Sequence, residues 1–85
     1  MSTEEVTHIA GPVEEDDTGR LMLRIPLYAG GDEFIDCTRE ISEIDGVFLK
    51  IFLPPWLCTK FALKEGSRVA IDNAGRKVNL QVIEL

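Results

Sequence analysis

The sequence has very few of the side chains on which most catalytic and metal sites depend. It contains one histidine, His8, and two cysteines, Cys37 and Cys58. Zinc sites and nucleophile–histidine pairs need these residue types in clusters, and the sequence has neither a second cysteine pair nor a second histidine. We therefore expect no structural zinc, no cofactor and no catalytic residues, and we interpret the protein as a non-enzyme.

Long apolar runs are also missing. No run approaches the roughly 20 residues that a bilayer-spanning helix needs, and the segment 1–17 is acidic without an apolar centre. We therefore expect no transmembrane helix, no signal peptide and a cytoplasmic location in which the cysteines stay reduced. The 85 residues, 45% of them hydrophobic, predict one small folded domain. Because so small a domain buries little apolar surface, we also expect a homodimer.

Charge is distributed unevenly along the chain. Residues 1–45 hold twelve acids and three arginines, a net charge of −9, whereas residues 46–85 hold six basic residues and three acids, a net charge of +3. This asymmetry fits either a basic nucleic-acid face or an acidic solvated tail, and we favour the tail. Residues 1–19 have few large apolar side chains, which predicts a flexible N-terminal tail before a single β-rich domain over residues 20–85.

Apolar patterns predict about four strands. Leu21–Ala29 alternates, and its proline places it at a sheet edge or beside a bulge, because proline cannot donate to a strand ladder. Val47–Leu53 is apolar except for one lysine, which is typical of a central strand covered on both faces. Two further alternating segments, 69–71 and 78–82, flank a turn at 72–75 whose Asn and Gly favour a hairpin.

The remaining segments predict little helix. Pro54 and Pro55 end the central strand, and proline in the first helical turn predicts a short helix at about 55–62. In residues 33–44 the apolar spacing suits a helix while the residue types favour a strand, so we expect a short helix or irregular turn through about Glu40. The predicted fold is a small, β-rich α+β domain, with a partly closed antiparallel sheet or barrel and one short helix.

The segment Lys50-Ile51-Phe52-Leu53-Pro54, followed by a short helix, Gly66 and a hairpin, resembles the basic-Ile-x-Leu-Pro strand end of the AbrB/MazE swapped-hairpin family. This resemblance implies an intertwined dimer that binds DNA as a transcriptional regulator or antitoxin, with Lys50 as the one DNA contact carried over. The preceding segment departs from the pattern, because the family usually has Asp-x-x-Gly where this chain has Gly46-Val47-Phe48-Leu49.

A second similarity spans about residues 21–80. The strings IPLYAGGDEFI, IDGVFLKI, LPPWL, EGSRVAIDN and GRKVNL are similar to small uncharacterised proteins encoded in mobile integron gene cassettes. That family has no activity to transfer, so the similarity implies a class of gene and not a reaction.

Residue type selects two sets of candidate contact residues. Tryptophan is enriched at interface hot spots, and Trp56 suits either that role or the centre of the core. The candidate interface residues are Trp56, Phe52 and Phe61. The candidate nucleic-acid contacts are Lys50, Arg76 and Lys77, the last two at a hairpin from which they can reach phosphates.

One loop holds the residues nearest to a chemical site. Asp32, Glu33 and Asp36 offer oxygen ligands for a divalent metal, although three acids after Gly-Gly are more often a solvated turn. Cys37 precedes Arg39 closely enough for the guanidinium to lower the thiol pKa, but we favour an inert, half-buried cysteine.

These features predict a non-catalytic, self-associating interaction or adaptor module of the mobile-cassette type, with an unidentified protein partner. The alternative function is an AbrB/MazE-like DNA-binding regulator or antitoxin.

Overall fold

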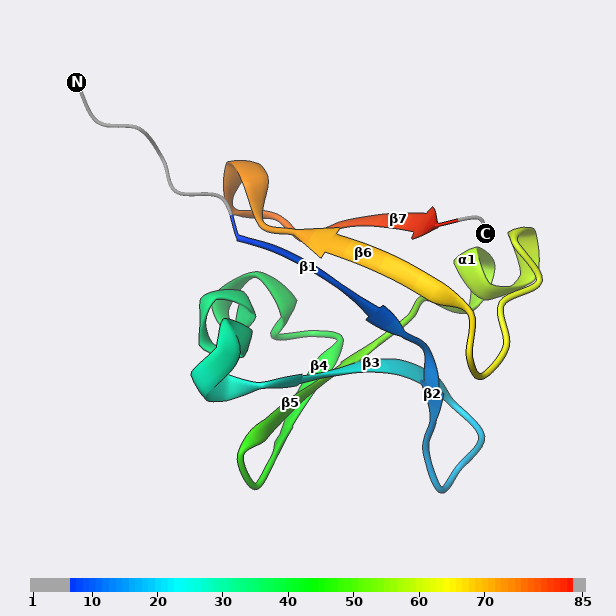
Figure 1. The fold of residues 1–85 in the computed structure, drawn as a ribbon, viewed down its shortest axis with the longest axis horizontal. Coiled ribbons are helices and arrows are strands. Elements are labelled where there is room, and N and C mark those ends of the chain that lie inside the picture. The colour runs from blue at the N-terminus through cyan, green and yellow to red at the C-terminus, as the bar shows by residue number, and fades with distance from the viewer. Residues whose placement is uncertain (1–6, 84–85) are drawn as a thin grey trace.

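The protein folds into two antiparallel sheets on either side of one core (Figure 1). The computed structural model describes residues 7–83. The three-stranded sheet, in the order β1-β6-β7, contains β1 (His8–Pro12), β6 (Arg68–Asp72) and β7 (Asn79–Ile83). The four-stranded sheet, in the order β2-β3-β5-β4, contains β2 (Glu14–Glu15), β3 (Leu21–Pro26), β5 (Phe48–Phe52) and β4 (Ser42–Asp45). Within residues 7–83 the sheets do not close into a barrel, so the predicted β-rich antiparallel fold is confirmed and the barrel alternative is wrong.

The N-terminal segment 8–15 runs through both sheets as one bent strand. Its first part, β1, pairs with β6, and its second part, β2, pairs with β3. Val13 lies at the bend and is 1% exposed. Its N–H donates to the Ser67 carbonyl at 2.6 Å, and its carbonyl accepts from the Gly66 N–H at 2.9 Å. The bend therefore ties the two sheets together.

This strand corrects the prediction of a flexible tail over residues 1–19, as far as residues 8–15 are concerned. The acids in this segment suggest a solvated tail, but Ile9, Gly11 and Val13 repeat with the period of a strand. The middle position is a glycine, and a Cβ there would make a tight contact of 3.3 Å with Leu23 Cδ1. Residues 1–6 of the predicted tail lie outside the described residues.

The core lies between the sheets and draws on both. Leu23 and Ile25 of β3 pair with Ile51 and Leu49 of β5, so all four side chains lie on one face. The buried cluster comprises Val13, Leu23, Ile25, Phe34, Leu49, Ile51, Leu53, Val69 and Ile71. The alternation in the sequence thus sets the inward face of each sheet correctly.

Three 3₁₀ turns connect β3 to β4 and place an aromatic residue in the core. They are η1 (Leu27–Ala29), η2 (Gly31–Phe34) and η3 (Asp36–Thr38). The Phe34 side chain is 0% exposed, and full burial of a phenylalanine stabilises a fold by about 1.5–3 kcal/mol. The Thr38 hydroxyl donates to the Phe34 carbonyl at 2.7 Å. An irregular turn through about Glu40, one of the two predicted alternatives, is therefore what the structure contains.

The strand that follows, β4, has no apolar alternation by which it could be predicted. Its one large apolar residue, Ile44, is 55% exposed, and Glu43 and Asp45 are exposed beside it. β4 forms because it pairs with β5 through the tight turn at Gly46.

The central unit largely follows the predicted pattern. β5 lies between β3 and β4, as expected for Val47–Leu53. β3 is also an interior strand in the order of the sheet. Its neighbour β2 pairs only with Leu21 and Met22, however, and β3 ends at Pro26. The predicted helix is found as α1 (Pro55–Lys60), with proline in its first turn. No helix between residues 7 and 83 has the length and apolar character needed to cross a membrane.

Gly31 is a position where the fold requires the absence of a side chain. A Cβ there would lie 2.8 Å from the Pro26 carbonyl oxygen and 3.0 Å from that of Ile25, both of them backbone atoms. We predict that Gly31→Ala lowers the free energy of unfolding by about 1–3 kcal/mol, the usual cost of overpacking. Urea denaturation measures this change.

Gly46 provides the matched control. Its φ is +61°, and a Cβ added there would meet no other atom within 4 Å. Asparagine tolerates this backbone conformation. Gly46→Asn should change the free energy of unfolding by less than about 0.5 kcal/mol. Equal effects of the two substitutions would contradict the steric explanation.

Candidate interaction surface

Trp56 lies on the surface of α1 and not in the core. Its side chain is 66% exposed, whereas the next residue, Leu57, is 5% exposed and anchors the helix on the core. Successive helical residues point about 100° apart, so burying Leu57 turns Trp56 outward. The core role for Trp56, one of the two predicted alternatives, is therefore wrong. Trp56 borders a groove of about 330 Å³ that is also lined by Ile41, Pro54, Leu57, Val78, Asn79 and Leu80.

Phe61 follows the same helix and is 44% exposed. Its N–H donates to the Leu57 carbonyl at 3.2 Å, and the positive φ of 51° at Ala62 then ends the helix. Phe61 borders a second hollow, which includes Val82 and Ile83 among its lining residues. Trp56 therefore lies beside the beginning of β7, and Phe61 lies beside its end.

Phe52, the third candidate interface residue, is covered within the chain. It is 8% exposed and lies on the outer face of the four-stranded sheet. The guanidinium of Arg20 lies 3.8 Å from the centre of its ring. Arg24 covers Phe48 on the same face in the same way, at 4.7 Å. The arginines thus supply the cover that a central strand needs on this face.

Lys50 lies between these two phenylalanines and faces acidic neighbours. Its Nζ lies 3.5 Å from an Asp45 carboxylate oxygen, and its side chain is 22% exposed. Across the ladder it pairs with Arg24 on one side and Glu43 on the other. Arg24 in turn lies 3.2 Å from Glu14. On the outer face the two basic side chains therefore lie side by side, and each forms an ion pair with an acidic residue.

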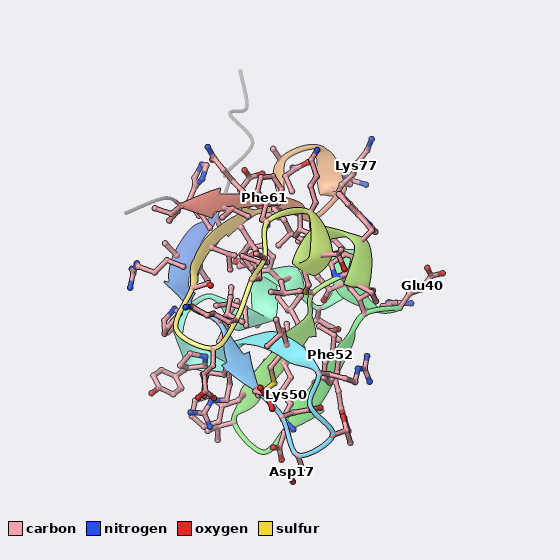
Figure 2. The ribbon with its side chains drawn as sticks, turned by 90° about the vertical axis from the view of Figure 1, so that its right-hand side faces the viewer. Asp17, Glu40, Lys50, Phe52, Phe61 and Lys77 are labelled. Carbon is pink, nitrogen blue, oxygen red and sulfur yellow. The ribbon has the colours of Figure 1, made fainter. Side chains whose placement is uncertain are left out.

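Arg76 and Lys77 occupy a different environment from Lys50. Both are exposed at the turn η4 (Ala74–Arg76) that precedes β7. Neither forms an ion pair with any residue in the described range. Figure 2 places Lys77 and Lys50 at opposite ends of the molecule. The structure therefore does not bring the three candidate nucleic-acid contacts together.

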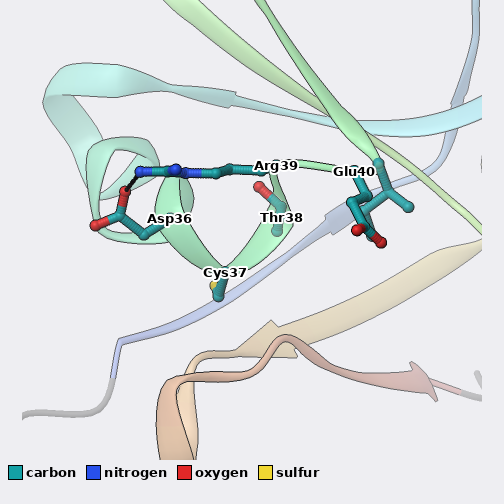
Figure 3. Close-up of a pocket in the computed structure, with 6 residues that line it drawn as sticks. Asp36, Cys37, Thr38, Arg39 and Glu40 are labelled. Carbon is teal, nitrogen blue, oxygen red and sulfur yellow. Dashed lines mark hydrogen bonds and ion pairs between the residues drawn. The ribbon is translucent and has the colours of Figure 1, made fainter.

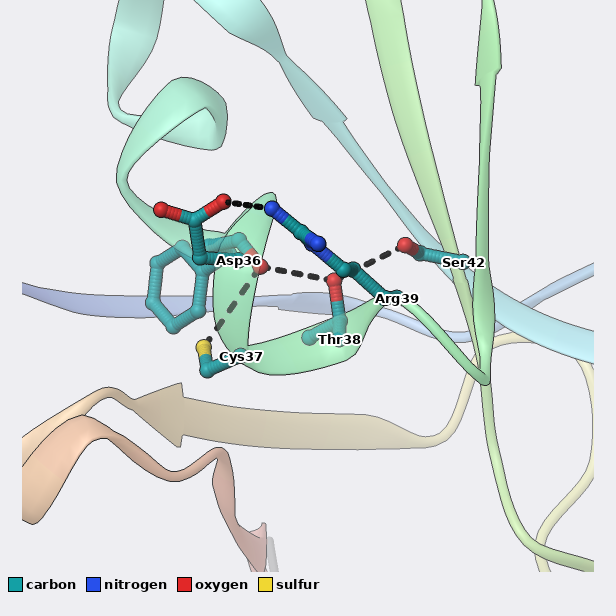
Figure 4. Close-up of polar contacts among 6 residues, drawn as sticks. Asp36, Cys37, Thr38, Arg39 and Ser42 are labelled. Carbon is teal, nitrogen blue, oxygen red and sulfur yellow. Dashed lines mark hydrogen bonds and ion pairs between the residues drawn. The ribbon is translucent and has the colours of Figure 1, made fainter.

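The surroundings of Cys37 in its loop do not favour the thiolate form of its side chain. Arg39 turns away and bonds Asp36 at 3.0 Å (Figure 3). Burial, aided by the nearby Asp36 charge, raises the pKa of the Cys37 thiol. Its Sγ donates a weak bond of 3.5 Å to the Phe34 carbonyl, beside the stronger bond from Thr38 (Figure 4). Burial also raises the pKa of the Cys58 thiol.

The acids of the same loop are not gathered into a ligand set. Across the described chain, no group of three histidine, cysteine, aspartate or glutamate side chains is placed to hold a metal ion. Asp32 is the second residue of η2 and Asp36 is the first residue of η3, so the two acids lie in successive turns.

His8 belongs to a polar cluster that the sequence pattern did not predict. In β1 it pairs with Asp72 of β6. The Asp72 carboxylate accepts from the Ala74 N–H at 3.0 Å and from the Asn79 side-chain amide at 2.8 Å. These two bonds, with a smaller contribution from His8, lower the pKa of Asp72. The cluster fixes the turn from which β7 starts. It was not predicted because His8 had been placed in a flexible tail.

Asn73 fixes the same turn from the other side. Its side-chain oxygen accepts from the Thr7 N–H at 2.9 Å, and its amide donates to the Glu33 carbonyl at 3.3 Å. The turn before β7 is thereby attached to the residue that precedes β1 and to η2, so the strand has a well-defined position at the rim of the molecule.

A comparison with known proteins finds no matching family model, no similar curated protein and no similar solved structure.

The geometry of Cys37 predicts slow thiol chemistry. Because burial raises its pKa, less thiolate is present at neutral pH than in free cysteine. In a Cys58→Ser variant, iodoacetamide should alkylate Cys37 more slowly than it alkylates free cysteine. The rate should keep rising at pH values at which free cysteine has reached its maximum. Faster alkylation than free cysteine at neutral pH would restore the activated-thiol interpretation.

Proposed function

We propose that the protein is a non-catalytic, self-associating interaction module that acts as a cytoplasmic homodimer. The observation that carries the proposal is the 66% exposure of Trp56 beside an apolar groove. A tryptophan on a short helix contributes little to its own fold at this exposure. Tryptophan in such a position is typical of a contact residue, because its large ring releases much water when covered.

The charge distribution favours this part of the surface for contact between two copies. The chain has a net charge of −6, so two copies repel each other over most approaches. Residues 78–83, which run past Trp56 and Phe61, contain no charged residue. Two copies can therefore meet here with the least electrostatic cost.

An adaptor also needs a second surface, and exposed apolar side chains at the other end of the molecule supply one. Tyr28 is 83% exposed, Val47 is 58% exposed and Ile44 is 55% exposed. The Leu27 N–H donates to the Val47 carbonyl at 2.8 Å, which joins η1 to the β4–β5 turn. We assign this surface to the unidentified protein partner. Both cysteines are free, which agrees with a reducing compartment.

Trp56→Ala tests the self-association. Loss of a hot-spot aromatic costs about 2 kcal/mol or more of binding free energy, so the variant should be monomeric at concentrations where the natural protein is dimeric. Sedimentation velocity over a micromolar concentration series measures this change. Tyr28→Ala is the matched control, because it removes an even more exposed aromatic residue from η1, at the far end of the molecule from α1 (Figure 1). A natural protein that stays monomeric throughout, or equal effects of both variants, would contradict the proposal.

The alternative, an AbrB/MazE-like DNA-binding protein, draws support from one observation. Arg76 and Lys77 are exposed and unmatched by acids in the described chain. Our proposal predicts no binding of a fluorescent DNA duplex at about 50 mM salt, the condition that most favours phosphate contacts. Binding that weakens with added salt and in an Arg76→Ala/Lys77→Ala variant would favour the alternative. A Lys50→Ala variant in the same binding assay tests separately the DNA contact that the AbrB/MazE resemblance implies.

A further inference from the structure

β7 is a sheet edge to which another strand can be added. It is the last strand in the order β1-β6-β7, and both Figure 1 and Figure 2 place it along the rim of the molecule. Among the residues described, no backbone hydrogen bond reaches the side of β7 that faces away from β6. An edge of this kind presents a row of free N–H and carbonyl groups to a strand of complementary shape.

The other sheet edges carry features that oppose strand addition, and β7 does not. β4 presents Glu43 and Asp45, both exposed. β1 ends in Gly11 and Pro12, and proline has no N–H to offer. Charges and prolines are the usual means by which proteins protect an edge from pairing. β7 reads Asn-Leu-Gln-Val-Ile and has neither.

We propose that β7 pairs antiparallel with β7 of a second copy, so that the two three-stranded sheets join into one continuous sheet. The inference rests on the proposed self-association and adds its geometry. A two-fold axis relates the copies, so the same strand serves as both halves of the contact.

The register follows from the length of the strand. All five residues of Asn79–Ile83 are paired only when the axis passes beside Gln81. Leu80 then lies opposite Val82 of the second copy, and in an antiparallel pair opposite residues share a face. Leu80 and Val82 are half-buried on the core side, opposite Ile71 and Val69 of β6. Pairing in this register therefore extends the core across the axis.

Gln81 meets its own copy on the other face of the joined sheet. Its side chain is exposed, and its amide can donate to and accept from the same amide across the axis.

The two exposed aromatic residues complete the contact. Trp56 lies beside the beginning of β7 and Phe61 beside its end. Antiparallel pairing places the beginning of one β7 at the end of the other, so Trp56 of each copy approaches Phe61 of the other. A strand pair alone is smaller than a stable interface, which buries about 1,000 Å² or more. The aromatic side chains supply the additional apolar area.

Opposite charges at Gln81 test the register, because this residue is predicted to pair with itself. Gln81→Lys and Gln81→Glu each place like charges across the axis, so each variant alone should dimerise at least about tenfold more weakly than the natural protein. An equimolar mixture of the two variants should recover dimerisation, because the mixed dimer pairs opposite charges. Sedimentation velocity measures all three samples. Restoration on mixing cannot come from variants that have failed to fold.

Glu43→Lys on the β4 edge is the control, and it should leave the dimer unchanged. If the natural protein is dimeric but the Gln81 variants dimerise normally, or the mixture recovers nothing, β7 pairing is overturned while the proposed function stands. If the natural protein is monomeric at every concentration, the result contradicts both the β7 pairing and the proposed self-association.

Discussion

One bent strand sets the relation between the two sheets. The chain from His8 to Glu15 pairs with β6 before the bend and with β3 after it. At the bend, Val13 is buried and both of its backbone groups bond to the loop that leads into β6. Covalent continuity therefore holds the sheets at a fixed separation, and Phe34 fills the space between them. Because the strand belongs to both sheets, weakening the bend loosens the whole core and not one edge alone.

The parts of the fold that depend on local pattern could be predicted from the sequence. The apolar run that becomes β5, the proline-initiated helix and the hairpin before β7 all carry their signals within a few residues. The strand His8–Pro12 carries no such local signal. Its partner β6 begins only at Arg68, and the inward face of the strand consists of Ile9 and a glycine. β4 could not be predicted for a related reason, since its position is decided by pairing with β5 and not by burial.

Only some features of the candidate interaction surface could likewise be predicted from the sequence. Residue type alone pointed to Trp56 and Phe61, but their exposure depends on Leu57 turning towards the core, which no pattern of two helical turns decides. The partial masking of Lys50 could not be predicted, because Asp45 reaches it only across a hairpin whose first strand lacks a sequence signal. The uncharged run in β7 was visible in the sequence. Its meaning as an open edge emerged only from the strand order.

The strand order also has a consequence for the chain as it is synthesised. β3, β4 and β5 can pair once the first part of the chain has left the ribosome, but β1 has no partner until residues 68–72 follow. During that interval the inner face of the four-stranded sheet lacks its opposite layer, a condition that favours aggregation. Asn73 then joins the new turn to Thr7 and Glu33, which lie far earlier in the chain. The last strands to be made are the ones that cover the core, so a chain released before β6 is complete leaves its larger sheet open to solvent.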